Sequence, residues 1–130
     1  MLAEHSIDVM LTAPDVGAAK RFYGEKVGLE VLIESDDFVT FRCGGDSRLV
    51  VTQSSTRGTD PTTKASWRVD DVVAEVAELR ARGVEVSHYD EPGLQTVDGV
   101  ADVGFALSAW FVDPGGNTIG LLQFKDRALA

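Results

Sequence analysis

The sequence predicts an α+β fold in which two βαβββ modules form a curved mixed sheet around a cleft. Three observations support this prediction: the same order of elements occurs in both halves, each half has one helix capped by Asp and closed by Gly, and each half has a Gly-rich hairpin turn before its last strand. The helices match in length, since Asp15 precedes Gly28 by 13 positions and Asp71 precedes Gly83 by 12. A single module would leave part of its sheet uncovered, so two modules closing around a cleft bury more apolar surface.

In the first half, alternating polarity over residues 6–12 predicts a half-buried strand. Ile7, Val9 and Leu11 share one face of it, and Asp8, Met10 and Thr12 share the other. Asp15 then caps a helix that ends at Gly28. Short β-branched or aromatic runs predict strands at residues 29–33, 38–43 and 48–53. The alternation over residues 38–53 fits two registers, so it assigns no cavity face there.

A stretch rich in Ser, Thr, Gly and Pro over residues 54–63 predicts a linker between the modules. We expect one domain over residues 1–130, with module one at about 6–53 and module two at about 64–124. In module two we predict strands at residues 65–69, 84–89, 106–112 and 117–124. Its helix places Val72, Val76 and Leu79 inward and a Glu78–Arg82 pair outward. An insertion over residues 90–104 is expected to lie over the cleft as a flap.

Composition excludes several classes of protein. The chain has 130 residues, a formal charge of −9 and 44% hydrophobic residues, which is typical of one globular domain. Nucleic acid is not an expected partner, because binding to phosphate backbones needs clustered Lys and Arg. No apolar run approaches the roughly 18 residues of a membrane span, so no membrane partner is expected. The single cysteine, Cys43, suits a reducing compartment, and we predict a cytoplasmic protein.

Several local motifs carry a resemblance to a known family. They are Phe22-Tyr23, Val27-Gly28-Leu29, Trp67-Arg68-Val69-Asp70-Asp71, Leu79-Arg80-Ala81-Arg82-Gly83-Val84 and Trp110-Phe111-Val112-Asp113-Pro114-Gly115-Gly116-Asn117. With these motifs the chain resembles the vicinal oxygen chelate superfamily over residues 6–123. That superfamily contains glyoxalase I, the bleomycin-resistance proteins, fosfomycin-resistance transferases and extradiol dioxygenases. The resemblance implies the same fold of paired βαβββ modules.

The resemblance also implies three positions where the enzymes of this superfamily hold a divalent metal on His and Glu side chains. In this sequence they fall on Asp8, Lys64 and Gly120. Only Asp8 is a suitable ligand, because a lysine ammonium repels a divalent ion and glycine has no side chain. We therefore predict no metal, no other cofactor and no recognisable catalytic residue.

The ligand site predicted from the resemblance and the alternation of the strands includes seven residues. They are Asp8, Met10, Thr12, Lys64, Arg68, Trp110 and Gly120. By its spacing from Asp113-Pro114, Trp110 takes a position that faces the cavity in similar proteins, where its ring stacks on a planar ligand or simply fills the space beside Gly120. Asp8 and Lys64, on matching first strands, form an ion pair or contact a polar group of the ligand. Trp67 is expected in the core.

These observations favour a metal-independent small-molecule binding protein similar to the bleomycin-resistance branch, with a role in antibiotic resistance. Its ligand would be planar or amphipathic, and the acidic net charge favours a cationic one. The alternative is a metal-dependent lyase, isomerase or dioxygenase whose ligands include Asp8, His88 and Glu91. A third reading is a scaffold whose cleft has collapsed around Trp110. Chains of this length in the superfamily are commonly homodimers, and we expect a homodimer.

Overall fold

The computed structural model describes residues 1–130, apart from the side chain of Leu129. The chain forms two compact units, each with its own sheet and helix. Unit 1 contains Met1–Asp60 and Asp113–Asn117, and unit 2 contains Pro61–Val112 and Thr118–Ala130. Each unit has a four-stranded mixed sheet. The predicted α+β class with two modules is therefore confirmed.

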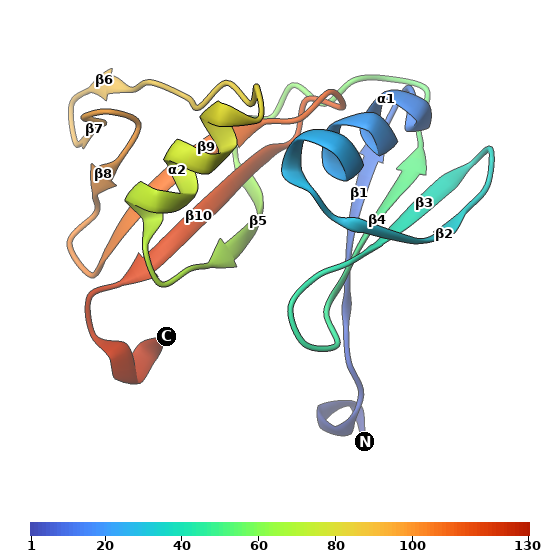
Figure 1. Cartoon of the computed structure of the whole chain (residues 1–130), viewed down its shortest axis with the longest axis horizontal. Helices are drawn as coiled ribbons and strands as arrows, with labels where there is room; N and C mark the ends of the chain where they lie inside the picture. Colours follow the sequence, from blue (N-terminus) through green and yellow to red (C-terminus); the bar gives the residue numbers. More distant parts are fainter. The chain divides into compact units, whose positions relative to one another are not determined.

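The unit 1 sheet has the strand order β1-β4-β3-β2. Its strands are β1 (Asp8–Ala13), β2 (Glu30–Glu34), β3 (Phe38–Arg42) and β4 (Arg48–Gln53). β1 runs parallel to β4, and the other neighbours are antiparallel. The helix α1 (Val16–Arg21) covers one face of this sheet (Figure 1). A short 3-10 turn, η1 (Leu2–Glu4), precedes β1.

The predicted start and end of the first helix are confirmed. The carboxylate of Asp15 accepts a hydrogen bond from Ala18 N at 3.0 Å, as a cap should. α1 continues directly into a π-helical segment, η2 (Phe22–Val27), which ends at Gly28 with a left-handed backbone. Tyr23 is fully buried within this segment and packs against Phe41 of β3.

The unit 2 sheet has the strand order β5-β10-β9-β8. Its strands are β5 (Thr63–Arg68), β8 (Ala101–Asp102), β9 (Ala106–Val112) and β10 (Thr118–Phe124). The helix α2 (Val72–Ala81) lies over one face of it (Figure 1). Asp71 caps α2, its predicted inward residues are buried, and Arg82 binds Glu78 at 2.9 Å, as predicted. A last 3-10 turn, η3, spans Arg127–Leu129.

The prediction of a strand over residues 84–89 is wrong. This segment makes only an isolated bridge between Val86 and Phe111 and one further bond from Ser87 N to β9. The chain then leaves β9, because the backbone of Tyr89 pairs with Thr96 instead. β8, a strand from the insertion, pairs with Leu107 and Ser108 of β9 further along the same edge.

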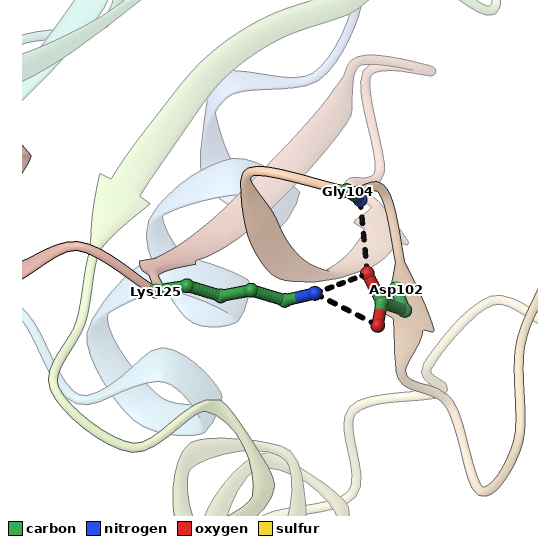
Figure 2. Close-up of polar contacts among 3 residues, drawn as sticks. All are labelled: Asp102, Gly104 and Lys125. Atoms are coloured by element: carbon green, nitrogen blue, oxygen red, sulfur yellow. Dashed lines mark hydrogen bonds and ion pairs between the residues drawn. The ribbon is translucent and has the colours of Figure 1, made fainter.

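The insertion over residues 90–104 is tied to unit 2 at several points. It contains a small hairpin of β6 (Asp90–Glu91) and β7 (Leu94–Gln95), followed by β8. Lys125 Nζ binds both carboxylate oxygens of Asp102 at 2.8 and 2.9 Å, and Gly104 N donates to the same group at 2.9 Å (Figure 2). The hydrogen bond from Lys125 lowers the pKa of Asp102 below its usual range. Within unit 2 the insertion therefore completes the edge of the sheet; a flap over the predicted cleft stays a prediction.

The turn between β9 and β10 belongs to unit 1 and is buried there. Asp113 is 2% exposed, and the hydroxyl of Tyr23 donates to its Oδ2 at 2.6 Å. Its Oδ1 accepts from the backbone N–H groups of Gly115 and Asn117, both at 2.9 Å. Asn117 Nδ2 in turn donates to Thr12 O at 2.9 Å. A buried carboxylate is tolerated here because four donors satisfy its oxygens.

No helix in the part of the chain that the structure describes is long and apolar enough to span a membrane.

Candidate ligand-binding site

The register of the unit 1 sheet decides which side chains lie on its helix-free face, the face opposite α1. β1 contributes Asp8, Met10 and Thr12, which pair with Arg48, Val50 and Thr52 of β4; β3 contributes Phe38, Thr40 and Arg42. The three predicted β1 residues thus share one face, as the alternation indicated. The pairing also settles the register of residues 38–53, which the sequence left open.

Four charged residues form one row across this helix-free face. Arg48 binds Asp8 through two hydrogen bonds, Nη2 to Oδ2 at 2.7 Å and Nε to Oδ1 at 3.1 Å. On the neighbouring strands, Arg42 Nε binds Glu30 Oε2 at 2.9 Å. The hydrogen bond from Arg48 holds the pKa of Asp8 below its ordinary value. Asp8 therefore has a partner in its own sheet, and a contact with Lys64 stays a prediction.

Sequence reasoning missed Arg48 as the partner of Asp8. The pair forms because β1 and β4 are parallel neighbours and place these two residues side by side. They are 40 positions apart in the chain, so no local pattern connects them. Met10, one pair further along β1, is 61% exposed, and Thr12 is also exposed.

In unit 2, one row of the helix-free face joins Ser66, Gly120 and Trp110 on three adjacent strands. A Cβ atom built on Gly120 would lie 2.6 Å from Ser66 Oγ and 3.5 Å from Trp110 Cδ1. The space over Gly120 is therefore filled by Ser66 and bordered by the indole. Ser66 was missed by sequence reasoning, although it alternates with Lys64 and Arg68 and so shares their face.

The two tryptophans occupy opposite faces of the unit 2 sheet. Trp110 is half-buried, and its ring meets the ring of Tyr89 edge to face, with centroids 5.4 Å apart. Trp67 instead stacks on Phe111 at 6.5 Å, on the face that α2 covers. Trp67 thus packs on the helix-covered face, but it is half-buried and is not part of the fully buried core that the sequence predicted for it. Tyr89 was missed, since it directly precedes the insertion and no alternation connects it to Trp110.

Lys64 and Arg68 lie on β5, and both are exposed. β5 has an irregularity beside Thr63, where the register with β10 shifts by one residue. Among the residues that the structure describes, the guanidinium of Arg68 has no ion pair or hydrogen-bond partner. Arg68, Gly120 and Trp110 therefore share one face of the sheet. Lys64 has no partner residue in β10, so its place on this face stays a prediction.

The residues at the three positions where the superfamily's enzymes bind metal do not fit a divalent ion. Asp8 is held by Arg48, Lys64 is a cation, and a carboxylate in place of Gly120 would collide with Ser66 Oγ. For the alternative ligand set, Nδ1 of His88 lies 3.2 Å from the hydroxyl of Thr96. Over the described residues, no group of three or more His, Cys, Asp or Glu is placed to hold a metal ion.

Two shallow surface hollows lie away from these residues. One, of about 520 Å³, lies beside α1 and η2 and includes Lys20 and Leu29. The other, of about 580 Å³, lies on the insertion and includes Leu94 and Leu107. Neither contains any of the seven predicted ligand residues.

The fold and the sequence agree on the class of protein. Residues 6–121 match the family model of the Glyoxalase/Bleomycin resistance protein/Dioxygenase superfamily, and the chain belongs to this superfamily. No curated protein sequence matches the chain significantly.

Solved structures of the same superfamily are similar over most of the chain. A glyoxalase/bleomycin resistance protein/dioxygenase from Alicyclobacillus acidocaldarius has a TM-score of 0.73 at 18% identity, covering 96% of this chain and 95% of that one. Lactoylglutathione lyase from Agrobacterium tumefaciens has a TM-score of 0.62 at 24% identity, with 92% of each chain covered. TnmS3, an antibiotic binding protein from Streptomyces sp. CB03234, has a TM-score of 0.57 at 29% identity, covering 93% of this chain and 98% of that one.

Proposed function

We propose that this protein binds a planar or amphipathic small molecule on the helix-free face beside Trp110 and does not change it chemically. The observation that carries the proposal is the aromatic corner of Trp110 and Tyr89, whose rings meet edge to face beside Gly120. A half-buried indole on such a face offers a flat surface on which a ring can stack. The likeness to TnmS3, an antibiotic binding protein, supports the same class of function.

An antibiotic is the ligand class that this likeness favours, and sequestration would then confer resistance. The metal-dependent alternative, a lyase, isomerase or dioxygenase, has less support, because Arg48 already binds Asp8 and Ser66 fills the space over Gly120. We further propose a cytoplasmic homodimer, as the single Cys43 and the superfamily resemblance suggest.

The binding proposal is tested with 2-naphthamide, a neutral planar probe, and isothermal titration calorimetry. Trp110→Ala is expected to weaken binding by about 1 to 3 kcal/mol, because the variant loses the stacking surface. Trp67→Phe is the matched control and should bind as the parent does. It also leaves Trp110 as the only one of the two tryptophans, so its single indole N–H signal in NMR spectra should shift when the probe is added.

Equal affinity of the parent and Trp110→Ala would remove Trp110 from the site. Native mass spectrometry of the protein as purified, and again after dialysis against manganese, nickel, zinc and iron, tests the alternative. A dimer without metal that carries a small organic molecule supports the proposal. A stoichiometric divalent ion would replace it with the metal-dependent reading.

A further inference from the structure

Two kinds of side chain lie in adjacent stripes on the helix-free face of unit 2. The first stripe, on β5, is polar and consists of Ser66 and Arg68, which pair with Gly120 and Leu122 of β10. The second, on β10 and β9, is largely apolar and includes Leu122, Phe124 and Trp110. Phe105 extends the apolar stripe, since its ring packs on that of Phe124 at 5.8 Å.

The charge of this face is opposite to that of the whole chain. The formal net charge is −9, yet the paired residues on the helix-free face of β5, β9 and β10 include the cation Arg68 and no carboxylate. Three acidic groups of unit 2 lie away from this face: Glu75 and Glu78 are on α2, which covers the opposite face, and Asp102 is bound to Lys125. The charge of these strands therefore differs in sign from the net charge of the chain.

Arg68 is the group on this face best placed to bind an anion. Its guanidinium is exposed, and the described residues supply it with no acceptor. The hydroxyl of Ser66, one pair closer to Trp110 along the strands, also has no hydrogen-bond partner among them. An arginine fork with a hydroxyl beside it matches the geometry of a carboxylate or phenolate.

The spacing of the two stripes limits the size of the ligand. β10 separates β5 from β9, and neighbouring strands lie about 4.8 Å apart, so Ser66 on β5 and Trp110 on β9 are roughly 10 Å apart across the sheet. A two-ring aromatic acid spans this distance with its rings beside Trp110 and its acid group toward Ser66 and Arg68.

We propose that the ligand of this site is a planar aromatic molecule with an anionic group, which Arg68 and Ser66 bind while Trp110 contacts the rings. This inference rests on the proposed binding function and adds the charge of the ligand. It replaces the expectation of a cationic ligand that the net charge suggested.

The test compares three probes of one shape and different charge: 2-naphthoate, 2-naphthamide and the cation 2-naphthamidine. Isothermal titration with the full-length parent should rank naphthoate about fivefold tighter than the amide, with the amidine weakest, as expected for an exposed charge pair. The Arg68→Gln variant should bind naphthoate and the amide with about equal affinity. The Arg68→Lys variant should keep part of the parent's preference for naphthoate. Arg82→Gln, on the opposite face of the sheet, is the control and should keep the preference.

Two failures of the test are distinguishable. If the probes bind and Trp110→Ala weakens them, but the amide or amidine binds as tightly as naphthoate in the parent, the charge assignment is overturned and the binding function stands. If no probe binds, or Trp110→Ala binds them unchanged, the proposed function is overturned and the charge assignment with it. A preference that survives in Arg68→Gln would show that Arg68 is not the anion-binding group.

Discussion

Tyr23 and Asp113 form a buried polar pair in unit 1, with the tyrosine hydroxyl 2.6 Å from the carboxylate. Burial raises the pKa of Tyr23 well above its ordinary value of 10.0, and the charge of Asp113 raises it further. The neutral tyrosine is therefore the form that the folded protein stabilises. Its hydroxyl is a donor that the buried carboxylate needs.

The first prediction concerns the loss of this donor. Tyr23→Phe should lower the free energy of unfolding by about 1.5 to 3 kcal/mol, because a hydrogen bond to a buried charged group is lost. The lower half of this range is expected, since Asn117 Nδ2 also donates to Oδ2 at 3.0 Å. Urea denaturation followed by circular dichroism measures the difference. An unchanged midpoint would mean that the pair does not stabilise the fold.

The second prediction concerns alkaline pH. The pKa of Tyr23 is higher in the folded state than the 10.0 of an exposed tyrosine. The resulting stabilisation is present in full below pH 10 and is lost as the pH rises above it, because only the unfolded chain then releases the proton. The parent should lose more stability between pH 9 and 11 than Tyr23→Phe does. Equal losses in urea titrations at these two pH values would contradict the assignment.

The third prediction concerns Asp8. Its pKa lies below the ordinary 3.8 because Arg48 donates hydrogen bonds to the carboxylate. This pair stabilises the fold above pH 3.8, and the stabilisation is lost as the pH falls through the lowered pKa. An NMR titration of the Asp8 carboxyl carbon should therefore show a midpoint below 3.8, which moves up toward 3.8 in Arg48→Gln. Arg82→Gln, at the C-terminal end of α2, should leave the titration midpoint of Asp8 unchanged. An Asp8 midpoint that is the same in the parent and in Arg48→Gln would refute the pairing.

At the scale of elements, the turn between β9 and β10 depends on two glycines. A Cβ atom on Gly115 would lie 2.6 Å from the backbone oxygen of Thr12. Gly116 has a φ of +83°, and a Cβ there would collide with the carbonyl of Gly58. The backbone on both sides cannot move aside as a flexible side chain would. Only glycine lets this turn lie so close to its neighbours in unit 1.

The fourth prediction uses this close approach. Gly115→Ala should lower the free energy of unfolding by about 3 kcal/mol or more, since the added methyl group meets backbone. Gly44→Ala is the matched control: it lies in the other hairpin turn, with nothing within 4 Å of its Cβ position. It should change the stability by less than about 0.5 kcal/mol. Similar thermal midpoints for the two variants would contradict the close approach.

The helices were predictable from local signals, and one strand was not. Asp15 and Asp71 cap their helices as the sequence indicated. β4 and β9 have the bounds that the β-branched runs predicted. Residues 84–89 also contain β-branched and aromatic residues, but they contact β9 only at Val86 and Ser87, and β8 pairs with β9 further along the same edge. Strand formation depends on hydrogen bonds to a neighbouring strand as well as on the local sequence pattern. Composition alone therefore predicted a strand at residues 84–89 where the structure has none.

At the scale of the whole molecule, the chain passes between the two units three times, after Asp60, Val112 and Asn117. The turn held in unit 1 is covalently continuous with β9 and β10, two strands of unit 2. Release of the turn therefore frees the ends of both strands. A substitution that destabilises unit 1 should consequently destabilise unit 2 as well.

The fifth prediction follows from this connectivity. Both tryptophans, Trp67 and Trp110, lie in unit 2, so tryptophan fluorescence reports on that unit, whereas circular dichroism reports on both. Tyr23→Phe, a change in unit 1, should lower the urea midpoint equally by the two measurements, as in a two-state transition. A fluorescence midpoint that stays in place while the dichroism midpoint falls would show that the units unfold independently.

The sequence by itself determined the repeated βαβββ order, the helix caps and the superfamily, because these depend on alternation, short-range caps and local motifs. The period of two residues along a strand also placed Asp8, Met10, Thr12 and Arg68 on the inner side of their strands, and the resemblance to the superfamily added Lys64, Trp110 and Gly120. Only the tertiary structure decided the register of residues 38–53, the partner of Asp8, the Ser66 hydroxyl over Gly120 and the contact of Tyr89 with Trp110. Each of these joins residues on different strands or loops, and strand pairing sets such contacts through hydrogen bonds between distant segments that no local pattern encodes.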